Sequence, residues 1–311
     1  MIKDKIDKDV VIIGAGIAGL TAGLYSGRLA LSTIVLENAL IGGQISSVAR
    51  IENYPGIESI GGTELTLEVM KQAQKFGTVI DEFDEIERLE LDGRVKLVET
   101  ANYIYAAKAV ILATGQHRRK LGLAEEDRFA NRGVHYCEVC DGHIYRGKVI
   151  AVAGGGNAAV DAANFLTKYA EKVWLIHRSE LRADESSQQR LFDNPKVEVM
   201  LQTKISKLIG DTRLRQVEIL DRATDAARLL DVDGLFVNAG VEPNVELFRD
   251  QIKLNERGFI IAGEDCRTNL EGVFAAGDVR EKEFRQLTTA AADGTVAALQ
   301  ADKYIRSQSR R

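Results

Sequence analysis

The 311-residue chain is poor in cysteine, since it contains only three. A small secreted protein held together by disulfides needs more, so the count excludes a disulfide framework. Two of the three, Cys137 and Cys140, lie in one Cys-x-x-Cys segment, and Cys266 is predicted to be a lone packed thiol. We therefore expect a reducing compartment and a cytoplasmic location.

The chain also lacks an excess of positive charge. Its 41 Lys and Arg residues stand against 46 Asp and Glu, which gives a net charge of −5. The short basic clusters 118–120 and 310–311 do not reverse this balance and are predicted to be solvated surface. Neither nucleic acid nor a membrane is therefore expected as a partner.

No charged residue occurs from Val10 to Gly27, and such a run of 18 residues raises the question of a signal peptide or membrane anchor. Five glycines interrupt the run, and charges of both signs precede it at residues 3–9. A signal peptide carries basic residues there instead. The glycine spacing is better explained by a nucleotide-binding loop.

The apolar fraction of 45% and the 28 glycines are typical of a compact α/β protein, and the length suffices for two domains. An apolar strand at 10–13 leads into a G-x-G-x-x-G segment and a helix predicted to end near Arg28. In this motif the first glycine makes a tight turn, the second lets the backbone approach a pyrophosphate, and the third lets the helix pack on the strand. The next strand, 33–36, ends at an acid that can accept both ribose hydroxyls of an adenosine. The predicted dinucleotide site comprises Gly14, Gly16, Ile17, Ala18, Gly19 and Glu37.

The same pattern recurs later in the chain. A strand at 149–153 is followed by G-x-G-x-x-A, a helix to about Tyr169 and a strand at 172–176. The first glycine and the strand-end residue are 23 positions apart in both copies, so two nucleotides are expected. Basic residues replace the acid in the second copy, which favours a 2′-phosphate and hence NADPH over NADH, although a solvated basic turn is the alternative. The predicted second site comprises Gly154, Gly156, Asn157, Ala158, His177, Arg178 and Arg182.

A third segment completes the predicted architecture. A strand at 272–276 runs into Gly277 and Asp278, an acid that can bind a sugar-alcohol hydroxyl such as those of a flavin, and a helix is predicted at 286–299. The chain therefore returns to its first domain after the second. The expected fold is α/β with two Rossmann-like (FAD/NAD(P)-binding) three-layer domains, the second inserted in the first. The predicted parts are 1–114 (FAD-binding, first part), 115–243 (NAD(P)H-binding, with the Cys-x-x-Cys) and 244–311 (FAD-binding, second part).

The segment from Cys137 to Gly142 carries the chemistry. Its two thiols can close a small disulfide, and Asp141, directly after the second thiol, can carry the proton that a dithiol gains or loses with each electron pair. The same spacing supplies half of a zinc site, which would need two more ligands from Cys266, His135 or His143, but the ligand spacing is poor. No metal is therefore expected.

These motifs together resemble those of the low-molecular-weight thioredoxin reductases, which belong to the two-dinucleotide-binding-domain flavoproteins. Further segments that match this family are Gly42–Gln44, Glu52–Gly56, Ala113–Gly115, Tyr145–Lys148, Gly277–Val279 and Arg285–Leu287. The resemblance implies tightly bound FAD, a homodimer, and electron flow from NADPH through FAD and the disulfide to thioredoxin or a thioredoxin-like protein. It also implies a wider set of cofactor contacts: Gly43, Gln44, Asn53, Ala113, Thr114, Gly115, Gly277, Asp278, Arg285, Gln286 and Leu287.

The resemblance also implies separate roles for the Cys-x-x-Cys residues. Cys140 matches the thiol that meets the flavin, Cys137 the thiol that attacks thioredoxin, and Asp141 the acid/base.

The chain departs from the family pattern at a few positions. Ser179 replaces an arginine of the second nucleotide site, Asn157 replaces an aspartate, and His143 stands at a usually aromatic position, where a second proton carrier is one interpretation. The alternatives to NADPH are therefore a different electron donor, namely NADH, ferredoxin or reduced flavin, or a dithiol oxidase that uses oxygen.

Overall fold

The chain is described here from a computed structural model that covers residues 3–46, 48 and 50–308. Its internal contacts divide it into two units, each described by itself. The first unit comprises Met1–His117 and Glu242–Arg311, and the second comprises Arg118–Val241. The sequence placed the limits after residues 114 and 243. The predicted basic cluster at 310–311 lies outside the described residues.

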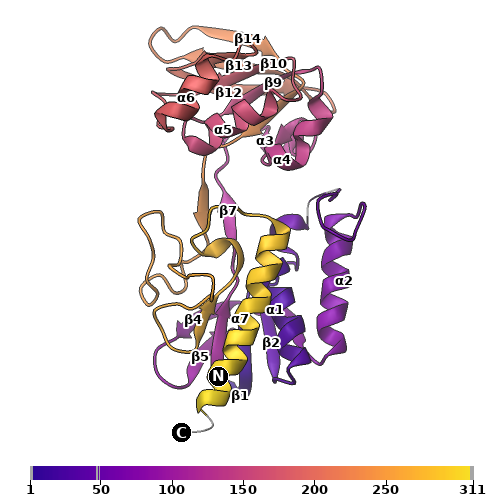
Figure 1. Cartoon of the computed structure of the whole chain (residues 1–311), viewed down its shortest axis with the longest axis vertical. Coiled ribbons are helices and arrows are strands. Elements are labelled where there is room, and N and C mark those ends of the chain that lie inside the picture. Colours follow the sequence, from indigo (N-terminus) through magenta and orange to yellow (C-terminus); the bar gives the residue numbers. More distant parts are fainter. Residues whose placement is uncertain (1–2, 47, 49, 309–311) are drawn as a thin grey trace. The chain divides into compact units, whose positions relative to one another are not determined.

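A largely parallel sheet forms the centre of the first unit (Figure 1). Its parallel strands, in spatial order, are β3 (Val79–Glu82), β2 (Thr33–Glu37), β1 (Asp4–Ile13), β6 (Tyr103–Leu112) and β17 (Val273–Ala275). β17 pairs with the C-terminal end of β6, and β5 (Lys96–Thr100) pairs antiparallel with its N-terminal half. β4 (Ile86–Glu90) then pairs with β5.

Helices cover one face of this sheet (Figure 1). They are α1 (Ile17–Arg28), α2 (Gly62–Lys75) and α7 (Leu287–Gln308), with the short helices η1 (Gly43–Ile45) and η3 (Gly277–Val279) between them in the chain. Along β1, Val10 and Ile12 face the helices, whereas Val11 and Ile13 belong to a second core on the other face. Because both faces of the strand are buried, its C-terminal half is continuously apolar.

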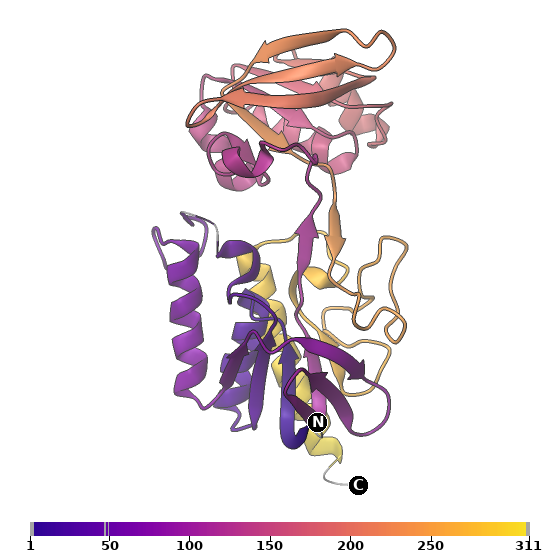
Figure 2. The same ribbon diagram turned by 180° about the vertical axis from the view of Figure 1, so that it is seen from behind.

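The second unit has a five-stranded parallel sheet with a different covering on each face. Its strands, in spatial order, are β11 (Val197–Met200), β10 (Lys172–Ile176), β9 (Val149–Ala153), β15 (Gly234–Val237) and β8 (Val134–His135). The helices α5 (Asn157–Leu166) and α6 (Glu185–Phe192) cover one face. The other face packs on an antiparallel sheet, seen in Figure 2, of β12 (Thr203–Gly210), β13 (Leu214–Asp221) and β14 (Ala227–Asp231).

Short elements complete the second unit and the two chain crossings. The helices are α3 (Glu126–Phe129), α4 (Glu138–Asp141) and η2 (Gly142–Tyr145). The crossings are the strands β7 (Gln116–Arg118) and β16 (Val241–Pro243), which pair with each other. No helix within the described residues is both long and apolar enough to span a bilayer.

The predicted fold class is confirmed, since both units place their parallel strands in the same Rossmann-like order. Two helix ends differ from the prediction. α5 ends at Leu166 because the amides of Lys168 and Tyr169 bond three residues back, which tightens residues 167–169 into turns. α7 continues to Gln308 because neither Gly nor Pro interrupts it after Leu299.

A buried carboxylate on α7 holds η3 in place. Asp293 accepts two hydrogen bonds from Arg280, at 2.8 and 2.9 Å, one from Lys282 at 2.7 Å and one from the amide of Gly277 at 3.0 Å. Burial raises the pKa of Asp293, but the hydrogen bonds from Arg280 and Lys282 outweigh it and leave the pKa below its ordinary value. The carboxylate is therefore ionised in the folded protein at neutral pH.

We expect Asp293→Asn to lower the free energy of unfolding by about 3–5 kcal/mol, because it leaves two cations beside a neutral amide in a buried site. Urea unfolding at pH 7 measures this loss. The matched control on the same helix is Asp302→Asn, which breaks an ion pair with the exposed Arg306 and should cost about 1 kcal/mol or less.

The loss should also depend on pH. The pKa of Asp293 is lower in the folded than in the unfolded protein, so its stabilisation is present above about pH 4 and disappears as the pH falls through the folded value. A difference between Asp293→Asn and the unmodified protein that persists undiminished in strong acid would contradict this assignment.

Candidate functional site

The three glycines of the first loop are required for different reasons. Gly14 has φ +102° and a Cβ there would lie 2.5 Å from the Ala113 carbonyl oxygen, while a Cβ at Gly19 would overlap the Gly14 carbonyl. At Gly16, no atom of the described residues lies within 4 Å of the position of a Cβ. Packing therefore requires Gly14 and Gly19, whereas the open space at Gly16 leaves room for a bound group.

This loop presents backbone amides at the start of a long helix. Gly16 is the N-cap of α1, no side chain caps it, and Ile17 and Ala18 form the first turn. Glu37, at the end of β2, accepts hydrogen bonds from the amides of Ala15 (2.9 Å) and Ala39 (3.2 Å). An uncapped helix N-terminus attracts an anion such as a pyrophosphate, so the residues present fit a dinucleotide.

Three other segments contact this loop. The amide of Gly42 donates to the Ala15 carbonyl at 2.9 Å, and a Cβ at Gly43 would lie 3.6 Å from the Cα of Gly16. Gly277 has φ +77°, and its Cβ would lie 2.8 Å from that of Ala18. The structure therefore gathers three of the predicted segments around the N-terminus of α1.

Gln116 connects further predicted residues and was missed by the sequence analysis. Its side chain is buried, and its amide nitrogen lies 3.4 Å from Asp278 Oδ2. Its carbonyl oxygen accepts a hydrogen bond from Gln44 at 2.9 Å. The only available signal was its position directly after 113–115.

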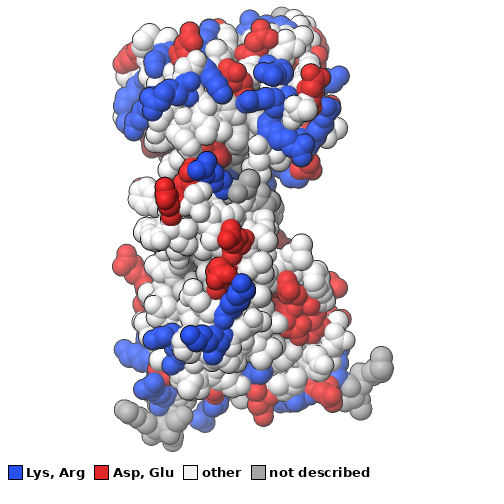
Figure 3. All heavy atoms as spheres, turned by 90° about the vertical axis from the view of Figure 1, so that its right-hand side faces the viewer, with Lys and Arg blue, Asp and Glu red and all other residues white. Residues whose placement is uncertain are grey.

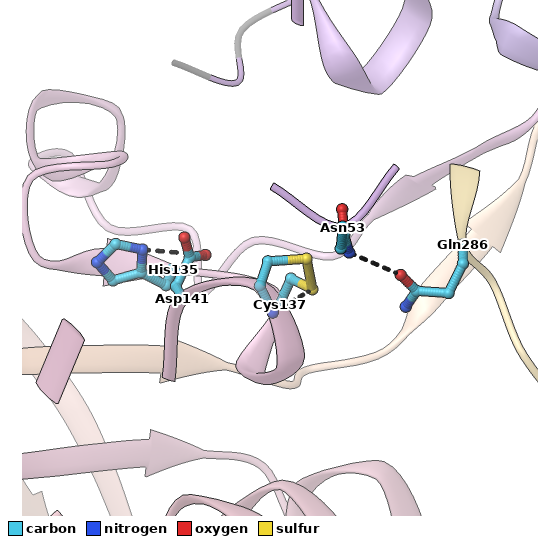
Figure 4. Close-up of a disulfide and its surroundings, with 6 residues drawn as sticks. Asn53, His135, Cys137, Asp141 and Gln286 are labelled. Atoms are coloured by element: carbon cyan, nitrogen blue, oxygen red, sulfur yellow. Dashed lines mark hydrogen bonds and ion pairs between the residues drawn. A yellow bond between two sulfur atoms is a disulfide. The ribbon is translucent and has the colours of Figure 1, made fainter. Parts of the chain in front are cut away.

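The remaining predicted residues lie in the same unit. Thr114 and Asn244 exchange two hydrogen bonds, of 2.6 and 2.8 Å, and the Gly115 carbonyl accepts from the Asn244 amide. Asn53 donates to Gln286 at 3.3 Å (Figure 4). Leu287 is the first residue of α7, and the Arg285 guanidinium lies 4.3 Å from the ring centre of Phe259, where burial lowers its pKa.

The second loop repeats the arrangement of the first. Gly154 has φ +149°, and a Cβ there would overlap the Asn238 carbonyl oxygen and lie 2.7 Å from the Ala159 Cβ. A Cβ at Gly156, the N-cap of α5, would again meet no described atom within 4 Å. The second glycine is thus the open position in both units, and the second loop also fits a nucleotide.

Polar contacts fix the second loop differently from the first. Asn157 and Asp184 exchange two hydrogen bonds, of 2.8 and 3.0 Å. His177 packs its ring on Gly155 and lies 3.0 Å from the Ser179 hydroxyl, and the Gly155 carbonyl accepts from the Arg182 amide at 2.7 Å. Asp184 was not predicted, because a residue that begins α6 gives no motif.

The basic residues near this loop differ in character. Burial and the charges of Arg182 and Arg178 lower the pKa of His177, so the imidazole is neutral at pH 7. The side chains of Arg178 and Arg182 are exposed. Figure 3 shows many Lys and Arg side chains on the face of the second unit that it presents. Ala158 precedes Ala159 in α5, and its carbonyl accepts from Asn238 at 3.3 Å.

The Cys-x-x-Cys segment forms the start of α4. Cys137 and Cys140 are joined by a disulfide, and the Cys140 amide donates to Cys137 Sγ at 3.2 Å. Asp141, the last residue of α4, donates its amide to the Cys137 carbonyl at 3.0 Å. Cys140 is exposed and Cys137 is half-buried. Burial raises the pKa of Glu138, which stands between them in the chain.

A buried histidine lies behind Asp141. His135 Nδ1 is 3.2 Å from Asp141 Oδ2, within ion-pair distance but outside hydrogen-bond geometry, and His135 Nε2 is 2.7 Å from the Tyr145 hydroxyl (Figure 4). The sequence considered His135 only as a zinc ligand. No group of three or more His, Cys, Asp or Glu able to hold a metal occurs among residues 3–46, 48 and 50–308.

Comparisons with known proteins agree with this geometry. A family model described as pyridine nucleotide-disulphide oxidoreductase matches residues 8–294. The "34.2 kDa protein in rubredoxin operon" of Clostridium pasteurianum is 45% identical over 304 residues, which cover 97% of this chain and 99% of that protein. The thioredoxin reductase of Listeria innocua is 40% identical over 300 residues, which cover 96% and 93%.

Solved structures give the same result. The crystal structure of thioredoxin reductase from Streptococcus pyogenes matches with a TM-score of 0.92 and 37% sequence identity, covering 97% of this chain and 99% of that one. Family and relatives both imply a flavin oxidoreductase that uses a nicotinamide cofactor. The chain belongs to the pyridine nucleotide-disulphide oxidoreductase family and, within it, to the low-molecular-weight thioredoxin reductases.

Proposed function

We propose that this protein is a thioredoxin-disulfide reductase, which passes electrons from NADPH through FAD and the Cys137–Cys140 disulfide to thioredoxin or a thioredoxin-like protein. The observation that carries the proposal is a disulfide at the start of a helix, with an acid directly after it, in a chain that has two nucleotide loops of the same design. The relatives named thioredoxin reductase support the choice of partner.

The first unit would hold FAD. The open position at Gly16 and the amides of Ile17 and Ala18 would receive the pyrophosphate, and Glu37 would accept the ribose hydroxyls. Asp278 would bind a hydroxyl of the ribityl chain. When bound, FAD accepts a hydride and passes on an electron pair. The surrounding contacts would come from Gly14, Gly19, Gly43, Gln44, Asn53, Ala113, Thr114, Gly115, Gly277, Arg285, Gln286 and Leu287.

The second unit would hold the nicotinamide nucleotide. The amides at the start of α5 and the open position at Gly156 would receive its pyrophosphate. The exposed guanidinium groups of Arg178 and Arg182 would pair with a 2′-phosphate. His177 would support the loop through its packing on Gly155 rather than through charge, because its ring is neutral at pH 7.

The two cysteines would have different roles. In the reduced protein, the Cys140 amide can donate to a Cys137 thiolate, and this favours Cys137 as the thiol that attacks the partner disulfide. Cys140 would then attack the mixed disulfide, release the reduced partner and reform the Cys137–Cys140 bond. Asp141 would accept or donate the proton that moves with each electron pair.

The assembly and location that we propose rest on the resemblance and on composition. A homodimer follows from the family, and a cytoplasmic location follows from the low cysteine count. The alternative donors are NADH, ferredoxin and reduced flavin, and the alternative acceptor is oxygen.

Purified protein should show a flavin spectrum that NADPH bleaches, and it should oxidise NADPH steadily only when an oxidised thioredoxin is present. Cys140→Ser should still be bleached but should lose turnover, and it should trap thioredoxin through Cys137 as a mixed disulfide, because the resolving thiol is gone. Cys137→Ser is the matched control and should form no such adduct. The reverse pattern would exchange the two roles, and absence of a flavin spectrum after reconstitution with FAD would refute the proposed function.

We expect a preference for NADPH over NADH of roughly 10- to 100-fold in kcat/KM, since one charge-assisted pair contributes about 1.5–3 kcal/mol and each 1.4 kcal/mol is tenfold. Arg178→Ala or Arg182→Ala should raise the KM for NADPH and leave that for NADH nearly unchanged, because only the phosphate contact is removed. Stopped-flow flavin reduction with both nucleotides measures this. Equal kcat/KM values in the unmodified protein would exclude a phosphate pocket here.

Asp141→Asn should slow reduction of the disulfide by roughly 10²-fold or more, the usual contribution of a positioned acid or base, with an unchanged FAD content. Rapid-reaction measurement of flavin reoxidation in the variant reports this step. A near-normal rate would assign the proton transfer to another group or to water.

A further inference from the structure

The residues behind Asp141 form a buried chain of side chains that the proposed function does not use. His135 is 4% exposed and Tyr145 is 1% exposed, and they are linked by a 2.7 Å contact between His135 Nε2 and the Tyr145 hydroxyl. The other ring nitrogen of His135 faces the Asp141 carboxylate, as Figure 4 shows. A histidine so enclosed can exchange protons with Asp141 on one side and with Tyr145 on the other.

The core holds both rings in these positions. The His135 ring stacks on Phe236, with centroids 5.4 Å apart, and meets the Tyr145 ring edge-on at the same distance. A Cβ at Gly234 in β15 would overlap the Tyr145 ring, so this strand position must be glycine for the ring to lie there. Neither aromatic ring can turn away without disturbing the sheet.

Charges around the pair favour an additional proton on it. The Asp141 carboxylate faces His135 directly, whereas the cations Arg213 and Lys148 and the carboxylate of Asp233 act on the far side of Tyr145. Burial raises the pKa of Tyr145 to about 12, so its hydroxyl keeps its proton and can donate to the neutral imidazole or accept from the imidazolium. The nearest charge to the ring is thus negative.

We propose that His135 is a positioning residue for Asp141, and that the two side chains share one exchangeable proton, which Asp141 passes to the cysteine thiolate released when the disulfide is reduced. This inference rests on the acid/base role proposed above for Asp141. Reduction of the disulfide to two thiols takes up two electrons and two protons. The pair supplies one proton and regains it from solvent, and oxidation by a partner disulfide passes two electrons and two protons on.

The shared proton has a consequence for pH dependence. An ordinary histidine retains its proton more than two pH units higher than an ordinary aspartic acid. A carboxyl group paired with His135 therefore has a proton to deliver at pH values where an isolated carboxylic acid has lost it. The contribution of His135 should grow as the pH rises from 5.5 to 8.

The test is the rate at which dithiothreitol reduces the Cys137–Cys140 disulfide of the purified full-length protein, as a function of pH. The dithiothreitol thiolate fraction rises with pH equally for all variants, so the ratio of variant to unmodified rate isolates the protein's contribution. His135→Asn keeps an N–H group near Asp141 but cannot hold a proton. Its ratio should lie near one at pH 5.5 and should fall roughly tenfold by pH 8, within the range of a general acid contribution.

Two further variants make the test decisive. Tyr145→Phe keeps the ring on Gly234 but removes the partner of Nε2, and it should show the same trend with a smaller amplitude. His143→Asn, which alters the exposed histidine two residues after Asp141, should show a ratio independent of pH. A ratio for His135→Asn that is the same at every pH, or a trend found in His143→Asn instead, would overturn the proposal.

The assay is independent of NADPH and thioredoxin. Failure to use either of them would refute the proposed function and leave this result standing, whereas a flat pH ratio in a protein that reduces thioredoxin would refute only the shared proton.

Discussion

The close backbone contact at the first glycine of each loop is the constraint on which both units depend. Gly14 lies on the carbonyl of Ala113 and Gly154 on that of Asn238, and both carbonyls belong to the residue that follows a central strand, β6 or β15. A side chain at either glycine would displace the loop and the helix N-terminus that it starts. The same strand ends continue into the crossings β7 and β16, so the nucleotide loops and the crossings have a common structural origin.

The two loops differ in how they are fixed to the neighbouring strand, and this difference separates their ligands. In the first unit the Glu37 carboxylate accepts from the Ala15 amide, so the group predicted to bind a ribose also holds the loop. In the second unit the backbone amide of Arg182 performs this task on Gly155, while the His177 ring fills the space beside it. The guanidinium groups of 178 and 182 thereby stay available to a ligand.

The fold could be predicted because its signals are local. Apolar runs such as 10–13 and 149–153 and the glycine spacing after them depend on near neighbours in the chain, and both strand–loop–helix units were found at the expected places. The contacts of Gln116, Asp184 and Asp293 were missed because their partners come from other elements. His135 was misjudged for the same reason, since its partners lie six and ten residues away across a strand and two short helices.

The buried chain behind Asp141 shows how a core residue can influence chemistry at the surface. A carboxyl group beside an exposed disulfide exchanges its proton with water and holds little of it near neutral pH. A histidine whose other nitrogen is held by a tyrosine keeps a proton close to the thiols without exposing it to solvent. That tyrosine can occupy its place only because residue 234 has no side chain. A glycine in the middle of a parallel strand usually weakens the strand, and here the cost is offset by the ring that it admits and by the proton position that the ring supports.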